Sequence, residues 1–126
     1  MNALSVLYVD DDPDIREVAA LSLGLDGQIK TKTAESGASA LAILDGGLVP
    51  DAILLDVMMP DLDGPATLGQ IRQRPHLADV PVIFITARAL GHEQARLLAQ
   101  GAKAIIVKPF DPISLARRVR EVLAAP

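Results

Sequence analysis

Short apolar runs recur along the chain, and the stretches between them have helical spacing. Strands are predicted at residues 6–9, 28–33, 52–55, 82–85 and 104–107. Four of these runs are nearly continuous and rich in β-branched residues, a pattern typical of parallel strands covered on both faces. The run at 28–33 alternates polar and apolar residues, which predicts a half-exposed edge strand.

The intervening segments carry apolar residues at the three- and four-residue intervals of helices. The stripes comprise Ile15, Val18, Ala19, Ser22 and Leu23; Ala38, Leu41, Ala42 and Leu44; Leu97 and Leu98; and Ile113, Leu115, Ala116, Val119 and Leu123. A strand followed by a helix, five times over, predicts one α/β domain over residues 1–126, with helices on both faces of a parallel sheet.

Local signals mark where the helices begin and end. An aspartate followed by proline predicts a capped helix start at Asp12-Pro13 and at Asp111-Pro112, and Gly64-Pro65 can start a helix in the same way. Glycine is favoured just beyond helix C-termini, so Gly46-Gly47 and Gly101 predict two helix ends.

Composition narrows the classes of protein and of site. With 126 residues, half of them hydrophobic, the chain can build one full core. It contains no cysteine, which excludes a disulfide framework, a thiolate metal site and a thiol nucleophile. Its net charge of −4 and the lack of a basic cluster indicate no direct binding to nucleic acid. No apolar run approaches the roughly 18 residues of a membrane span, so we expect a cytoplasmic protein without membrane contact.

Polar side chains follow four of the predicted strands at the point where each strand ends. Asp10 and Asp11 follow the first strand, Asp56 the third, Thr86 the fourth and Lys108 the fifth. Ligands of open parallel sheets bind outside the carboxyl ends of the strands. These five side chains are therefore expected to meet at one edge of the sheet.

The expected cluster has the chemistry of a phosphoryl-acceptor site. Three crowded carboxylates repel one another unless a cation joins them, and oxygen ligands without histidine or cysteine favour Mg²⁺. Lys108 adds a positive charge suited to a phosphate oxygen, and Thr86 adds a hydroxyl donor. An aspartate in such a site can attack a phosphoryl group in line.

The same residues carry a resemblance to a known family. The segments 7–12, 54–64, 85–87 and 107–110 resemble the signature stretches of two-component response-regulator receiver domains, in order and over essentially the whole chain. The resemblance implies a flavodoxin-like, doubly wound five-stranded parallel sheet of order 2-1-3-4-5 with five helices. It also implies a phosphorelay signalling domain rather than an enzyme, with only self-catalysed phosphoryl transfer and autodephosphorylation.

The resemblance implies roles for the acidic residues. Asp56 would be phosphorylated to an aspartyl phosphate. Asp11, the Asp56 carboxylate and the backbone carbonyl of Met58 would bind Mg²⁺, and Asp10 would act on the metal through water. The donor would be a phosphohistidine on a sensor histidine kinase or a histidine phosphotransfer protein.

Further expectations concern the switch. Lys108 would bind the phosphoryl group ahead of a cis peptide bond at Pro109, and Thr86 would turn inward to hydrogen-bond it, with the backbone at Ala87 following. The chain departs from the family pattern at Ile105, where receivers usually carry a tyrosine or phenylalanine that swings inward on activation. We therefore expect output to depend more on the backbone over residues 87–92, and to pass to a protein target, a fused effector or a phosphorylation-linked dimer.

Two other functions stay open on these residues. A phosphatase of the haloacid-dehalogenase type also uses a strand-end aspartate, and it would carry the phosphoryl group on Asp10 instead of Asp56. A receiver-like scaffold that is never phosphorylated is the second alternative, although degenerate receivers usually lose an acidic residue or the lysine. A dinucleotide-binding domain is disfavoured because no glycine-rich fingerprint follows the first strand.

Overall fold

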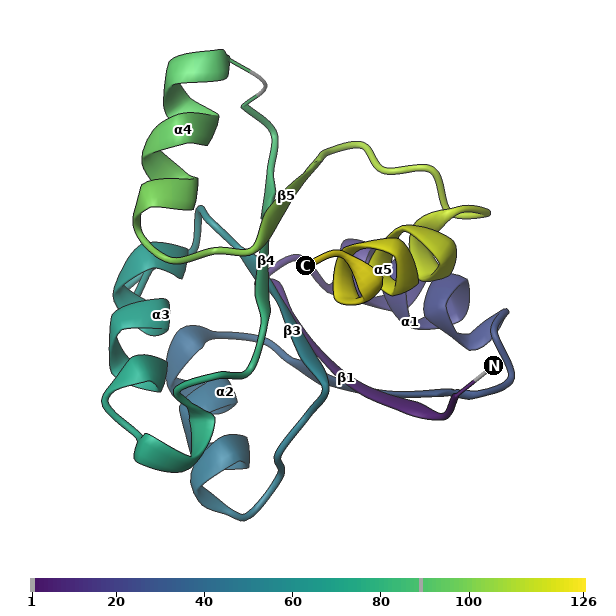
Figure 1. Cartoon of the computed structure of the whole chain (residues 1–126), viewed down its shortest axis with the longest axis horizontal. Helices are drawn as coiled ribbons and strands as arrows, with labels where there is room; N and C mark the ends of the chain where they lie inside the picture. Colours follow the sequence, from purple (N-terminus) through teal and green to yellow (C-terminus); the bar gives the residue numbers. More distant parts are fainter. Residues whose placement is uncertain (1, 89) are drawn as a thin grey trace.

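The computed structural model describes residues 2–88 and 90–126 and contains a five-stranded parallel sheet. Its strands are β1 (Leu4–Val9), β2 (Ile29–Ala34), β3 (Ala52–Asp56), β4 (Val82–Thr86) and β5 (Ala104–Val107). The strands lie in the order β2-β1-β3-β4-β5, so the predicted strand order is confirmed (Figure 1). The first reversal of this order lies between β1 and β3, which places the ends of these two strands side by side.

Helices cover both faces of the sheet (Figure 1). One face carries α1 (Pro13–Gly24) and α5 (Leu115–Ala124), and the other carries α2 (Gly37–Asp45), α3 (Gly64–Arg72) and α4 (Gly91–Ala99). A short 3₁₀ helix, η1 (Pro75–Leu77), precedes β4 and was not predicted from the spacing. Within residues 2–88 and 90–126, none of the helices has the length and apolar character that crossing a membrane requires.

Burial of the central strands explains the continuous apolar runs. Every side chain of β3 and of β4 is buried. Side chains alternate across the sheet, so Leu7 and Val9 pack with the helices α2, α3 and α4, while Val6 and Tyr8 pack with α1 and α5. At the edge, β2 buries its two end residues and exposes residues between them, which confirms the predicted half-exposed edge strand.

Side-chain caps begin two helices where the sequence predicts them. A carboxylate oxygen of Asp12 accepts the backbone N–H of Asp14 at 2.9 Å, and α1 begins at Pro13. Asp63 accepts the N–H of Ala66 in the same way, and α3 begins at Gly64. These caps satisfy N–H groups that have no partner inside the helix. They also fix where the loops after β1 and β3 turn back toward the sheet.

The prediction that the last helix begins at Asp111-Pro112 is wrong. Residues 112–114 form a turn, and α5 begins at Leu115. The Asp111 carboxylate accepts the N–H of Ile113 at 3.0 Å, and the Asp111 carbonyl accepts the N–H of Ser114 at 3.2 Å. Asp111 therefore caps this turn instead of the helix, and Ile113, expected in the buried stripe, is 78% exposed.

The predicted apolar stripe of α2 is right for Leu41 and Leu44, which pack in the core, and wrong for Ala38 and Ala42, which are exposed. The helix buries Gly37, Ala40 and Leu44, whereas Ala38 is exposed. A Cβ atom at Gly37 would lie 2.3 Å from the Thr67 hydroxyl oxygen, so α2 approaches α3 through this glycine. The residues three and seven positions later share that face and are buried with it.

Two other members of the predicted stripes lie at the surface. Val18 in α1 and Leu98 in α4 are 43% and 45% exposed. Their neighbours Ala19 and Leu97 are buried. Because a helix turns by about 100° per residue, adjacent positions lie on different sides, and each of these helices buries a narrower stripe than the sequence indicates.

Candidate functional site

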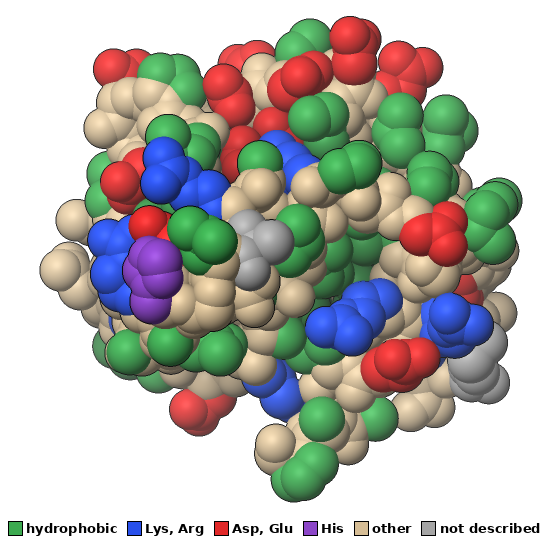
Figure 2. Space-filling view, turned by 90° about the horizontal axis from the view of Figure 1, so that it is seen from above, with side chains coloured by type: hydrophobic (Ala, Val, Ile, Leu, Met, Phe, Trp, Pro, Cys, Tyr) green, Lys and Arg blue, Asp and Glu red, His purple; other side chains and the backbone are tan. Residues whose placement is uncertain are grey.

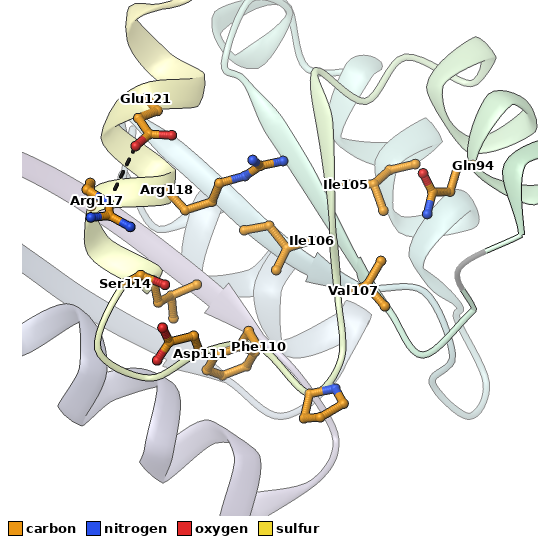
Figure 3. A pocket seen from close by; sticks show the side chains of 12 residues that line it. Gln94, Ile105, Ile106, Val107, Phe110, Asp111, Ser114, Arg117, Arg118 and Glu121 are labelled. Atoms are coloured by element: carbon orange, nitrogen blue, oxygen red, sulfur yellow. Dashed lines mark ion pairs between the residues drawn. The ribbon is translucent and has the colours of Figure 1, made fainter.

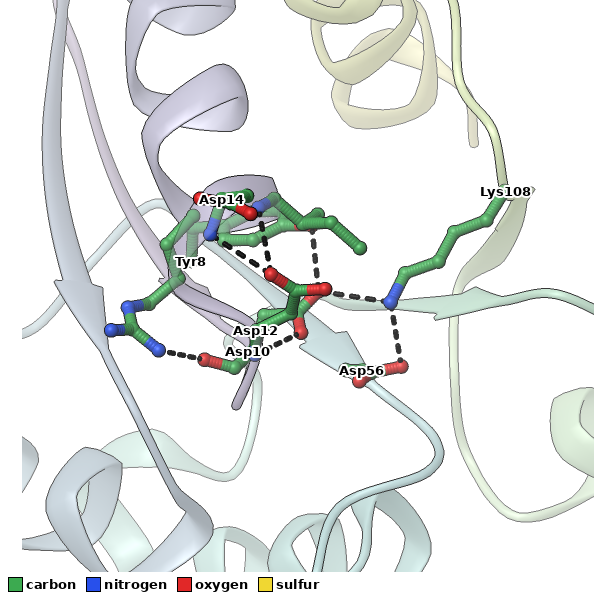
Figure 4. A network of polar contacts seen from close by, with 8 residues as sticks. Tyr8, Asp10, Asp12, Asp14, Asp56 and Lys108 are labelled. Atoms are coloured by element: carbon green, nitrogen blue, oxygen red, sulfur yellow. Dashed lines mark hydrogen bonds and ion pairs between the residues drawn. The ribbon is translucent and has the colours of Figure 1, made fainter.

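The carboxyl ends of four strands bring the predicted side chains to one edge of the sheet. Asp10 follows β1, Asp56 ends β3, Thr86 ends β4 and Lys108 follows β5. Asp10, Asp56 and Thr86 are each at most 4% exposed. Three of the five expected groups, the two buried aspartates and the lysine, are in direct contact (Figure 4).

Asp10 lies fully buried within a set of hydrogen-bond donors. Its Oδ2 atom is 2.9 Å from Lys108 Nζ and 3.2 Å from the Tyr8 hydroxyl, which donates to it. Its Oδ1 atom accepts the backbone N–H of Asp12 at 3.0 Å. The guanidinium of Arg16 donates to the Asp10 carbonyl at 2.8 Å and fixes the backbone at the same point.

Tyr8 and Arg16 are contacts that the sequence analysis did not assign. Tyr8 stands two positions before Asp10, and alternate residues of a strand share one face of the sheet, so this spacing is a signal that could have found it. Arg16 lies in the first turn and a half of α1, six positions after Asp10. No motif or spacing in the sequence distinguishes Arg16 from an ordinary surface arginine.

Lys108 connects the two buried aspartates. Its Nζ atom lies 2.9 Å from Asp10 Oδ2 and 3.2 Å from Asp56 Oδ1. Burial by itself would lower the pKa of Lys108, but the hydrogen bonds and negative charges of the two aspartates outweigh burial and raise that pKa. The ammonium is therefore charged near neutral pH. The peptide bond between Lys108 and Pro109 is cis.

Asp56 has a carboxyl group that its surroundings disfavour in the charged form. Burial, followed by the negative charge of Asp10, raises the pKa of Asp56 from 3.8 to about 6. The charge of Lys108 and a hydrogen bond from the backbone N–H of Met58 act in the opposite direction. A cation placed beside this carboxylate would favour ionisation further.

The three aspartates form a group suited to a hard cation. Asp10, Asp11 and Asp56 each offer a carboxylate oxygen, and these oxygens all lie within 4.8 Å of one another. Acidic side chains gather along one margin of the face seen from above (Figure 2). Oxygen donors of this kind fit Mg²⁺. The side chain of Met58 is 65% exposed, and the role expected of its carbonyl stays a prediction.

The loop between β3 and α3 passes close to Asp56. The backbone N–H of Gly64 donates to the Val57 carbonyl at 2.9 Å. A Cβ atom at Gly64 would lie 2.6 Å from the Asp56 carbonyl oxygen and 2.8 Å from the Val57 Cα. Only a residue without a side chain fits this approach, so Gly64 keeps the loop against the acceptor position.

Thr86 lies buried beside the start of the β4–α4 loop. Its hydroxyl oxygen accepts the backbone N–H of Arg88 at 3.1 Å, and Ala87 between them is exposed. The Arg88 guanidinium lies 3.6 Å from a carboxylate oxygen of Glu93 in α4. Of the expected switch segment 87–92, residue 89 lies outside the described residues. Thr86 thus connects through Arg88 to the first turn of α4.

Ile105 occupies the position where receivers usually carry an aromatic ring. It is half-buried and packs against the apolar cluster on the α2–α4 side of the sheet. It also lines a cavity of about 510 Å³ between α4, β5 and α5, together with Gln94 and Arg118 (Figure 3). On α5, Arg117 and Glu121 form an ion pair at the rim of this cavity. Ile105 therefore packs on the α4 side of β5 and lines the wall of this cavity.

The sequence of the chain matches a known protein family. The model of the response regulator receiver domain matches residues 6–120. Response regulator Rre1 of Synechocystis sp. is 35% identical over 121 residues, which cover 96% of this chain and 52% of Rre1. The uncharacterized 14.6 kDa protein in the sodA1 3'region of Leptolyngbya boryana is 34% identical, with 97% of this chain and 92% of that protein covered. The chain spans about half the length of Rre1.

Solved structures are similar over nearly the whole chain. The chemotaxis response regulator CheY4 of Vibrio cholerae is 29% identical with a TM-score of 0.87, covering 96% of this chain and 99% of that one. A putative response regulator from Chloroflexus aurantiacus is 32% identical with a TM-score of 0.87, covering 98% and 100%. The sequence comparison and the structure comparison therefore indicate the same family.

Proposed function

The chain belongs to the response regulator receiver family, and from this premise we propose that Asp56 accepts a phosphoryl group from a phosphohistidine. The donor would be carried by a sensor histidine kinase or a histidine phosphotransfer protein, and residues 1–126 would act as one receiver unit. The observation that carries the proposal is the position of Asp56, which lies 3.2 Å from Lys108 Nζ within a group of three carboxylates.

The transfer is a displacement at phosphorus. A carboxylate oxygen of Asp56 attacks in line, the new O–P bond forms as the N–P bond breaks, and the electron pair leaves with the imidazole nitrogen. No general base is needed because Asp56, with a pKa of about 6, is mainly ionised near neutral pH. Lys108 can turn its ammonium from the aspartates to an oxygen of the incoming phosphoryl group.

The acidic group supports a Mg²⁺ site in this reaction. Asp11, Asp56 and the Met58 carbonyl would hold the ion, with Asp10 acting through water. When bound, Mg²⁺ supplies positive charge that offsets repulsion between the phosphoryl oxygens and the carboxylates. The negative charge of Asp10 and the positive charge of Lys108 then act in opposite directions on the ionisation of Asp56.

Thr86 and the β4–α4 loop would report the modification. The Thr86 hydroxyl accepts the Arg88 N–H and keeps its own O–H for donation to a phosphoryl oxygen. Movement of Thr86 toward Asp56, together with the backbone at Ala87, would then displace the segment that leads into α4. Because Ile105 has no ring to reorient, this loop would carry the main structural change.

The output is proposed to be regulation of a protein partner or of a fused effector, with no catalysis on a separate substrate. Relatives include one protein named as a probable transcriptional regulator and one named as a probable cyclic di-GMP phosphodiesterase, of which this chain spans 44% and 26%. The matched region is shared among proteins whose names state different activities, which supports a regulatory role for it.

The phosphatase alternative is not favoured by the site. It requires Asp10 as the nucleophile, but Asp10 is fully buried and both of its oxygens already accept hydrogen bonds. The scaffold alternative predicts no labelling at all. The three functions therefore differ in the residue that carries the phosphoryl group: Asp56 in the proposal, Asp10 in the phosphatase and none in the scaffold.

Labelling with acetyl phosphate and Mg²⁺, followed by intact-protein mass measurement, tests the proposal. We expect one added phosphoryl group in the wild type, and none in Asp56→Asn or when Mg²⁺ is withheld. A phosphoryl group that persists in Asp56→Asn would contradict the assignment of the acceptor. An unmodified wild type, also with a phosphohistidine donor, would support the scaffold alternative.

A further inference from the structure

Tyr8 is a fully buried side chain in the middle of β1 that reaches the proposed acceptor site. Its ring packs in the apolar cluster between the sheet and the helices α1 and α5. Its hydroxyl donates to Asp10 Oδ2 at 3.2 Å (Figure 4). The ring is held by the core and the hydroxyl by the site, so Tyr8 connects the two.

The donors around Asp10 leave it little freedom to turn. Oδ2 accepts from Tyr8 and Lys108, and Oδ1 accepts from the backbone N–H of Asp12. An ionised carboxylate has about four lone-pair directions, so three are used by donors of this chain and one is left. Tyr8 therefore helps to determine where the remaining lone pair points.

Tyr8 and Lys108 differ in what they can do during the proposed reaction. Lys108 is shared between Asp10 and Asp56 and would turn to the phosphoryl group. Tyr8 cannot follow, because its ring is enclosed by the core. It keeps a hydrogen bond on Asp10 after the lysine has moved. Because the phenol is neutral, it also holds the carboxylate without adding a charge that would repel a cation.

We propose that Tyr8 is a positioning residue that orients the Asp10 carboxylate for the divalent cation, so that cation affinity depends on the Tyr8 hydroxyl. The inference rests on the metal site of the proposed function. It assigns Tyr8 no contact with the reacting atoms. Hydrogen-bond partners of groups that hold a metal typically change metal affinity by about 10- to 100-fold when they are removed.

Tyr8→Phe tests the inference because it keeps the ring and removes only the hydroxyl. Mg²⁺ titrations followed by backbone amide NMR signals give the dissociation constant for the folded protein. We expect about tenfold weaker Mg²⁺ binding in Tyr8→Phe. Ser22→Ala is the matched control, since it removes another buried hydroxyl, which donates to the Val18 carbonyl in α1. This control should leave the Mg²⁺ affinity unchanged, and equal affinities in wild type and Tyr8→Phe would overturn the inference.

Phosphoryl labelling of the wild type separates the inference from the proposed function. A labelled wild type together with unchanged Mg²⁺ affinity in Tyr8→Phe overturns the role of Tyr8 alone. An unlabelled wild type whose Mg²⁺ affinity still falls in Tyr8→Phe supports that role and contradicts the proposed phosphoryl transfer.

Discussion

At the scale of single residues, the site holds two buried carboxylates close to one lysine. Asp10 and Asp56 share the ammonium of Lys108, so one positive charge balances two potential negative charges. The burial of Asp56 and the charge of Asp10 raise the pKa of Asp56 to about 6. A protonated Asp56 relieves this imbalance, and the folded protein therefore binds that proton more tightly than the unfolded chain does.

The raised pKa of Asp56 predicts a pH-dependent stability. Its folded value of about 6 lies above its ordinary value of 3.8, so its contribution to stability falls as the pH rises through this window. Asp56→Asn removes this contribution. Without Mg²⁺, the variant should gain stability relative to the wild type by about 2–3 kcal/mol between about pH 4 and pH 7.

Urea unfolding of both proteins at several pH values measures this difference. Glu121→Gln, at an exposed position on α5, is a control that should show no such pH-dependent gain. A constant difference between Asp56→Asn and wild type across the window would contradict the predicted ionisation.

At the scale of elements, the β3–α3 connection shows how a glycine keeps a loop against a reactive residue. α3 contains Gly64 at its first position and Gly69 within it. A Cβ atom at Gly64 would meet the backbone of Asp56 and Val57 at less than 3 Å, while a Cβ atom at Gly69 would meet nothing within 4 Å. The two positions therefore form a matched pair in one helix.

Alanine at these two glycines should have opposite effects on stability. Gly64→Ala forces the loop away from β3 and is expected to lower the free energy of unfolding by about 1–3 kcal/mol. It should also slow phosphoryl labelling of Asp56, because the Asp56 backbone must shift. Gly69→Ala restricts the unfolded chain without a clash and should raise the free energy of unfolding by about 0.5–1 kcal/mol. Similar urea midpoints for the two variants would contradict this account.

At the scale of the whole molecule, Arg120 joins three distant parts of the chain. Its guanidinium contacts the Asp26 carboxylate at 2.5 and 3.2 Å and donates to the Asn2 carbonyl at 2.8 Å. These contacts connect α5, the loop between α1 and β2, and the segment before β1. By contrast, Arg117 on the same helix pairs with Glu121 four residues later and is 75% exposed.

Arg120→Met should therefore lower the thermal unfolding midpoint more than Arg117→Met. The hydrogen bond from Arg120 lowers the pKa of Asp26, so this pair stabilises the fold above the ordinary carboxyl value of 3.8. Its contribution is lost as the pH falls through the lowered value, and the two variants should then converge. Calorimetric scans at neutral and acidic pH measure both effects.

The sequence by itself determined the order of strands and helices and the composition of the site edge. Continuous apolar runs define β3 and β4 because both faces of these strands are buried. The same runs also predict that Asp56 and Thr86 lie at the strand ends, because each apolar run stops at one of these polar residues. The segment signatures around them then indicated the family and the strand order that the structure contains.

Tertiary structure alone decided the contacts between residues from different elements. The phase of α2 depends on how Gly37 meets Thr67 in α3, and the start of α5 depends on a turn closed by Asp111. The hydrogen bond from Tyr8 to Asp10 needs the strand, its covering helices and the site edge together. Periodicity reports which side of an element is apolar, but it does not report which partner reaches that side, because packing depends on residues far away in the chain.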